Sequence, residues 1–188
     1  MIDRGWLAGL TVIFGATGLY CLWRLAVGRG RGIETVVDVN HVLMSPAMVV
    51  MLWWPADGVA RWVQVAVFGG AAVVFFRQLA GSVEVTARTG ALLHAAMNFG
   101  MVWMLLAMPS LMPNHGDLAM DMTRSHPLVG VQAWTAMLTG VVAASLTLAA
   151  AWWLLHAVRS PGHRILCTCH ALATAGTAVT LALISPGL

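Results

Sequence analysis

Two stretches of the chain place one histidine and three methionines at the same spacing. The stretch HVLMSPAMVVML begins at residue 41, HAAMNFGMVWML begins at residue 94, and both read H-x2-M-x3-M-x2-M-L. On a helix, offsets of 3, 7 and 10 residues keep these side chains within roughly 80° of one face. A third copy, HALATAGTAVTL, keeps the histidine and has Ala173, Thr177 and Thr180 at the methionine positions. The candidate metal ligands are therefore His41, Met44, Met48, Met51, His94, Met97, Met101, Met104 and His170.

A row of thioether and imidazole groups suits a soft metal ion. Methionine sulfur is a soft ligand and histidine nitrogen a borderline one, and together they favour Cu(I), for which cysteine is a stronger ligand still. Further ligands of these types extend the row at both ends: Met112, His115, Met120, Met122 and His126 on one side, and Cys167 and Cys169 on the other. The pattern predicts Cu(I) binding by the bundle, and copper transport or handling as the function.

Two other functions fit the same residues. Methionine also fills gaps in helical cores, so the stripes agree with a non-catalytic accessory subunit of a larger membrane complex. His41 and His94 also suit a b-type haem electron carrier, as axial ligands from facing helices. No nucleophile–base pair, phosphate-binding loop or zinc protease signature occurs in the sequence, so we do not expect an enzyme.

Composition assigns the chain to the membrane proteins. Of its 188 residues, 60% are hydrophobic and 9% charged, and the mean hydropathy is +0.82, values typical of a polytopic membrane protein. The expected partners are the lipid bilayer and either another membrane protein or a second copy of the chain. The net charge of +3 gives no indication of nucleic-acid binding. Three cysteines in apolar segments argue against a disulfide framework.

Six apolar segments predict an all-α membrane protein with one integral membrane domain over residues 1–188. Each segment is long enough to cross about 30 Å of hydrocarbon; they span residues 6–27, 37–54, 59–78, 88–108, 129–157 and 164–185. We expect three tandem helical hairpins, over residues 1–54, 55–108 and 129–188, with an external loop at 109–128.

The repeat predicts how the hairpins are arranged. Tandem parallel repeats usually share an axis along the membrane normal, so the three histidine-bearing helices should run parallel as an inner ring, with their histidines at one depth. Asp38 precedes His41 by three residues and is expected to orient its ring by accepting the second N–H. Pro46 should kink the second helix.

The arginines predict the orientation in the cell membrane. The loops after segments 1, 3 and 5 carry seven arginines, and the opposite side carries three, namely Arg4, Arg61 and Arg124. Because cytoplasmic loops of membrane proteins carry excess arginine, we expect both termini outside.

The repeated H-x2-M-x3-M helices and the arginine-ended hairpins resemble an actinobacterial family of small multi-pass membrane proteins of uncharacterised function. This resemblance covers most of the chain, although the third copy here has lost its methionines. Separately, Met44 with Met48 and Met97 with Met101 are similar in chemistry to copper uptake channels of the Ctr type, trimers in which each subunit supplies M-x3-M. That local similarity implies copper as the ligand.

Overall fold

The structure is a computed structural model that describes residues 4–30, 32–54, 58–111 and 128–184. The helices are α1 (Arg4–Ala26), α2 (Ile33–Trp53), α3 (Gly58–Gly81), α4 (Val85–Leu111), α5 (Leu128–Arg159) and α6 (Arg164–Ile184). A short 3-10 helix, η2 (Pro161–His163), joins α5 to α6. The described residues contain no strand. The predicted all-α fold with six long apolar helices is confirmed.

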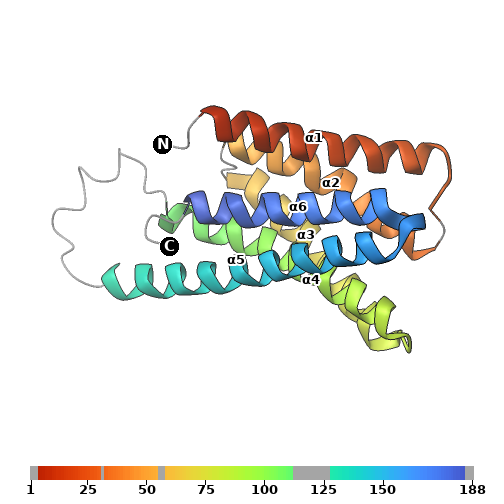
Figure 1. Ribbon diagram of the computed structural model, residues 1–188. Helices are drawn as coiled ribbons and strands as arrows, with labels where there is room; N and C mark the ends of the chain where they lie inside the picture. Colours follow the sequence, from red (N-terminus) through yellow and green to blue (C-terminus); the bar gives the residue numbers. More distant parts are fainter. Residues whose placement is uncertain (1–3, 31, 55–57, 112–127, 185–188) are drawn as a thin grey trace.

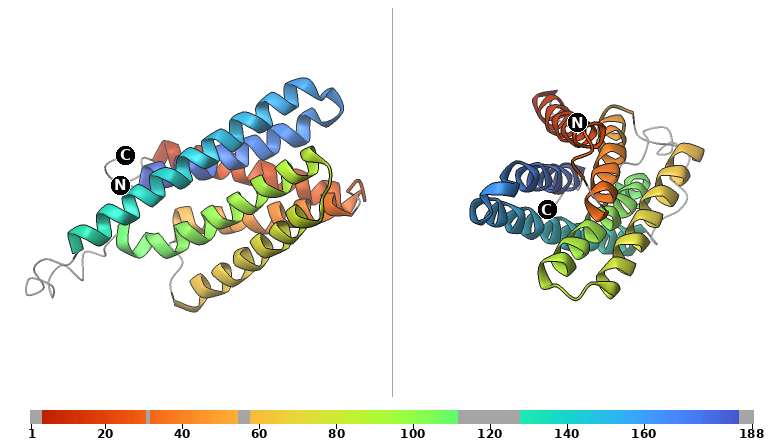
Figure 2. Two further views of the ribbon diagram at one scale, coloured as in Figure 1. Left: turned by 90° about the horizontal axis from the view of Figure 1, so that it is seen from below. Right: turned by 90° about the vertical axis from the view of Figure 1, so that its right-hand side faces the viewer.

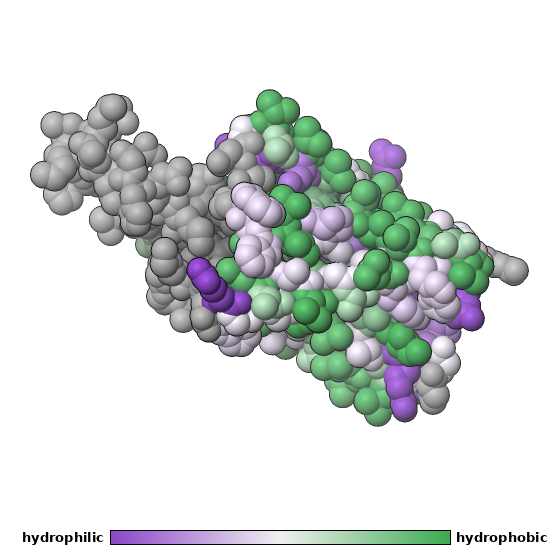
Figure 3. Space-filling model, turned by 90° about the horizontal axis from the view of Figure 1, so that it is seen from above, coloured by the Kyte–Doolittle hydropathy of each residue, from purple (hydrophilic) through white to green (hydrophobic). Residues whose placement is uncertain are grey.

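Each of the six helices has the length and composition of a membrane span. The candidate spans contain 20 to 27 residues with a mean hydropathy of 1.5 to 1.8. Several helices extend beyond the predicted segments: α2 begins at Ile33 rather than at residue 37, and α4 continues to Leu111. Helix α2 also continues through Pro46. Large apolar side chains are exposed on all six helices, as expected for a surface that lies against lipid. They are spread over the coloured part of the face shown in Figure 3, with paler and some hydrophilic residues between them.

The helices pack as three hairpins, as predicted. α1 lies against α2, α3 against α4 and α5 against α6, and the three connections lie at the same end of the bundle (Figure 1). The first connection turns through Gly28, whose φ of 64° favours glycine. The amide of Arg29 donates to the carbonyl of Arg24, which closes the end of α1. We call the end that carries these connections the loop end.

The second helix of each hairpin is the more buried one. Within the apolar windows, 39%, 56% and 56% of the residues of α2, α4 and α6 are buried, against 28%, 17% and 28% for α1, α3 and α5. This difference agrees with the predicted inner ring of α2, α4 and α6, which can be followed end-on in Figure 2. The outer helices expose Trp6, Trp62 and Trp134 near their first turns, where tryptophan commonly marks the membrane interface.

The methionine stripes lie in the centre of the bundle. All six repeated methionines are buried and belong to one apolar cluster with Leu10, Phe14, Leu105, Leu146 and Leu181. The three positions that lack methionine in the third copy, Ala173, Thr177 and Thr180, are buried as well. The shared helical phase that the sequence repeats three times therefore corresponds to one inward face on three helices.

Candidate metal centre

Three imidazoles meet between α2, α4 and α6. The ring centroids of His41 and His170 are 4.5 Å apart, those of His94 and His170 are 4.9 Å apart, and those of His41 and His94 are 5.5 Å apart. The side chains are exposed to only 0%, 3% and 2% for His41, His94 and His170. The expectation that the repeated histidines converge at one depth is confirmed. We call these three residues the histidine triad.

The triad brings one nitrogen from each of three rings into a group of the kind that holds a metal ion. One potential ligand atom from each ring lies within 4.8 Å of the other two. Nε2 of His41 lies 3.3 Å from Nδ1 of His170. Two nitrogens that bind one ion at about 2.0–2.1 Å, at tetrahedral to trigonal angles, are about 3.3–3.6 Å apart. These two nitrogens are therefore at coordination distance, and they are also within hydrogen-bond distance of each other.

Most of the remaining nitrogens of the triad have no partner. Nδ1 of His41, Nδ1 of His94 and Nε2 of His170 are buried without a hydrogen bond among the described residues. A buried polar atom that loses its bonds to water and gains none in the protein costs about 1–3 kcal/mol. Three such atoms in one cluster favour a function that uses the rings over a purely packing role.

Aromatic rings enclose the triad on the side of α3 and α5. The ring of Phe75 stacks on His94 at a centroid distance of 5.2 Å. Trp153 packs against His170 at 4.7 Å and against His94 at 5.6 Å. These ring contacts restrict the orientation of two of the imidazoles. Neither aromatic residue is recognisable as part of the site from the sequence alone.

Asp38 does not orient His41, and the prediction of that contact was wrong. The carboxylate instead accepts from Arg24 of α1, with Nε of Arg24 3.0 Å from Oδ2 of Asp38. A second nitrogen of Arg24 donates to Glu34, also at 3.0 Å. The reason is electrostatic, because a guanidinium pairs with a buried carboxylate more strongly than a neutral imidazole N–H does.

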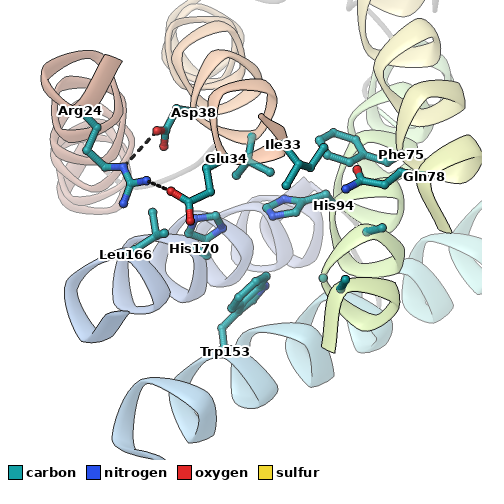
Figure 4. A pocket seen from close by; sticks show the side chains of 14 residues that line it. Arg24, Ile33, Glu34, Asp38, Phe75, Gln78, His94, Trp153, Leu166 and His170 are labelled. Atoms are coloured by element: carbon teal, nitrogen blue, oxygen red, sulfur yellow. Dashed lines mark hydrogen bonds and ion pairs between the residues drawn. The ribbon is translucent and has the colours of Figure 1, made fainter. Parts of the chain in front are cut away.

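A cavity of about 180 Å³ connects the triad with the loop end of the bundle. His94, His170 and Trp153 line one part of it, and Arg24, Glu34 and Asp38 line another. Figure 4 shows both groups of side chains around the cavity, with Arg24 joined to both acidic residues. Most of the other lining residues are apolar or small. The metal candidate thus lies at the inner end of a cavity with a charged mouth.

The methionines continue the site into the bundle. The hydroxyl of Thr174 lies 3.1 Å from the sulfur of Met97 and also donates to the carbonyl of His170. Met97 follows His94, and Thr174 follows His170, by about one helical turn. The first layer beyond the triad therefore contains a thioether on α4 that contacts a hydroxyl on α6.

The other predicted ligands do not join the triad in the described part of the chain. Cys167 packs with Trp153, Ala157 and Ala171 in a separate cluster, and all three cysteines are free thiols. The candidates on the connection between α4 and α5 lie outside the described residues; they are Met112, His115, Met120, Met122 and His126.

A comparison with protein-family models matches residues 33–184 to one family, described as a domain of unknown function, DUF5134. The chain belongs to the DUF5134 family. No curated protein and no solved structure matches it. The DUF5134 match begins at the first residue of α2 and ends at the last residue of α6. It therefore includes the whole triad but not α1, which supplies Arg24.

Proposed function

We propose that this protein binds one Cu(I) ion at the histidine triad and transports or handles copper through the bundle. The observation that carries the proposal is the convergence of the buried His41, His94 and His170, with one nitrogen of each within 4.8 Å of the other two, on three helices that should cross the membrane. Ionisable residues inside membrane helices are rare and usually serve a function. Three of them in contact are harder to explain by packing than one alone.

The charge of the site favours Cu(I) over divalent ions. Three neutral imidazoles bring no negative charge, and the nearest acidic groups that line the cavity are paired with Arg24. The free energy needed to bury an ion rises with the square of its charge, so a singly charged ion is buried at a lower cost than Zn²⁺. The six buried methionines are soft ligands that stabilise Cu(I) in particular.

The two alternative functions fit the geometry less well. A haem between His41 and His94 needs room for its flat macrocycle beside the axial nitrogens, yet the ring of His170 lies within 5 Å of both. An accessory subunit needs only packing contacts, and it gives no reason to retain three buried nitrogens without partners. Copper accounts for the triad and the methionines together.

We also propose where the protein is located and how it is oriented in the membrane. We place the protein in the cell membrane with both termini outside, because seven of ten arginines lie around the three connections at the loop end. The cavity that leads to the triad then opens towards the cytoplasm. Copper would reach or leave the triad from that side, while the methionine cluster extends towards the outer face.

The test is a Cu(I) titration of protein purified in mild detergent under reducing conditions, against a competing Cu(I) chelator. We expect one tightly bound ion per chain in the parent. His94→Ala and His170→Ala should each lose it, since each removes one of three ligands. His163→Ala is the matched control, because His163 is exposed on η2 and lies outside the triad.

Two results would overturn the copper function. A parent protein that binds no Cu(I), although thermal denaturation shows that it is folded, would exclude the triad as a copper site. Equal loss of copper in His163→Ala would show that binding is not specific to the triad. A Soret band in the purified parent would support the haem carrier instead.

A further inference from the structure

The mouth of the cavity contains charged side chains that metal binding at the triad does not require. One guanidinium, Arg24, faces two carboxylates, Glu34 and Asp38. The sum of these charges is negative by one unit when both carboxylates are ionised. Asp38 is fully buried, and its Oδ1 has no hydrogen-bond partner among the described residues, although Oδ2 is paired. Asp38 therefore lines the cavity as a buried carboxylate with one unpaired oxygen, whereas buried polar atoms usually have a hydrogen-bond partner.

We propose that Asp38 is a transit site for a soft monovalent cation on its way between the loop end and the triad. The proposal rests on the copper function above and extends it to the route by which the ion arrives. The cation would occupy the free side of the Asp38 carboxylate, while Arg24 keeps its contact with Glu34. From there the ion would pass to His94 and His170, which line the same cavity.

The arrangement suits transit rather than final binding. A carboxylate is a hard ligand, so it attracts a soft cation by charge and releases it readily to imidazole and thioether groups. A net negative charge at the mouth of a cavity with apolar walls raises the local cation concentration and the rate of entry. Glu34, whose side chain is 44% exposed, would face arriving cations first, and the buried Asp38 second.

Arg24 is the counter-ion that keeps the mouth stable when no cation is present. Its side chain is only 10% exposed, and it links α1 to two positions one turn apart on α2. With two acceptors available, it retains one ion pair while the other carboxylate interacts with the cation. A lone buried carboxylate without this arginine would carry a large desolvation cost.

The experiment uses Ag⁺ as a redox-stable probe for Cu(I), mixed rapidly with the full-length protein in detergent. The signal is the part of the tryptophan fluorescence change that His94→Ala lacks, because Trp153 packs on the triad. We expect Asp38→Asn to load about tenfold more slowly than the parent, within the range for electrostatic steering. Its final Ag⁺ occupancy at saturation should equal that of the parent.

Two further variants keep the result interpretable. Glu34→Gln removes one negative charge but leaves the buried Arg24–Asp38 pair, and it should slow loading by a smaller factor, which shrinks as salt is raised. Glu84→Gln removes the same charge from the exposed loop between α3 and α4, away from the cavity lining, and should load like the parent. If Asp38→Asn does not fold, Glu34→Gln against Glu84→Gln decides the question.

The outcomes separate this inference from the function on which it rests. Parent rates in both Glu34→Gln and Asp38→Asn would overturn the transit site while leaving the triad intact. Loss of saturating occupancy in a folded Asp38→Asn protein would also overturn it, because Asp38 would then belong to the final site. No Ag⁺ or Cu(I) binding by the parent itself would instead refute the proposed function.

Discussion

The side chains of the triad and of its surroundings have distinct physical roles, which single substitutions separate. His41, His94 and His170 bring one nitrogen each within 4.8 Å of the other two. Phe75 and Trp153 pack against two of the rings, and the methionines extend the soft surface into the bundle. Only the triad and the methionines are recognisable from their spacing in the sequence. The aromatic residues belong to helices whose sequences carry no such repeat.

Methionine-to-leucine substitutions distinguish ligands from packing groups. We expect the double variant Met48→Leu, Met101→Leu to bind Cu(I) more weakly than the parent, but to lose less affinity than His41→Ala or His94→Ala. Leucine and methionine have similar volumes, so each swap should cost less than about 1.5 kcal/mol of stability. Copper content under reducing conditions and thermal denaturation measure the two effects. Copper binding equal to that of the parent would assign these methionines to packing alone.

The ion pair between Arg24 and Asp38 should be energetically coupled. Arg24→Gln leaves the fully buried carboxylate of Asp38 without its cation, and we expect a loss of about 3–5 kcal/mol. The double variant Arg24→Gln, Asp38→Asn should lose less than the sum of the single variants. Thermal denaturation of the four proteins gives the coupling. Additive effects would show that the pair contributes nothing beyond its separate residues.

At the scale of the helices, close packing depends on small residues where α1 meets α2. A Cβ atom on Gly18 would lie 2.7 Å from Cβ of Ser45, so the two helices would have to separate. We expect Gly18→Ala to destabilise the protein by about 1–3 kcal/mol. Gly15→Ala is the matched control on the same helix, since nothing lies within 4 Å of its added Cβ.

The control variant Gly15→Ala should change the stability in the opposite direction. In an open helical position, replacing glycine by alanine gains about 0.5–1 kcal/mol from the unfolded chain. Thermal denaturation in one detergent should therefore place Gly18→Ala below the parent and Gly15→Ala at or above it. A Gly18→Ala protein as stable as the parent would mean that α1 does not pack on α2 as closely as the structure shows.

The six helices and their pairing were predictable because each has a long apolar stretch and the hairpins repeat. The positions of the triad were predictable because the histidines share a helical phase. The partner of Asp38 was not predictable from the sequence, because Arg24 lies on α1, which lacks the repeat. Helix α1 is apolar on nearly all sides, so its hydropathy pattern does not indicate which face points inward. Trp153 could not be assigned to the site for the same reason, because α5 is also apolar on nearly all sides.

At the scale of the whole molecule, the three connections at one end give the bundle a direction. The arginine distribution predicts that this end is cytoplasmic. In a cysteine-free background, we expect Gly116→Cys to react with an impermeant thiol reagent in intact cells and Ser82→Cys to react only after lysis. The reverse pattern would invert the topology and would make the cavity open to the outside.

The cavity and the triad together determine what the molecule would do as a whole. The cavity joins the loop end to His94 and His170, and the buried methionines follow on the same inward face of α2 and α4, farther from the loop end. Movement of an ion through the bundle would thus pass from carboxylate to imidazole to thioether. This order follows from packing between hairpins, which no single repeat specifies.

The most direct measurement of the central claim is X-ray absorption at the copper edge on protein loaded with one equivalent of Cu(I). We expect a first shell of imidazole nitrogens at about 2.0 Å, as for histidine bound to a first-row ion. That shell should be lost in His94→Ala and retained in His163→Ala. A first shell made of sulfur alone, at about 2.3 Å, would exclude copper binding at the triad and would move the binding site to the methionines or cysteines.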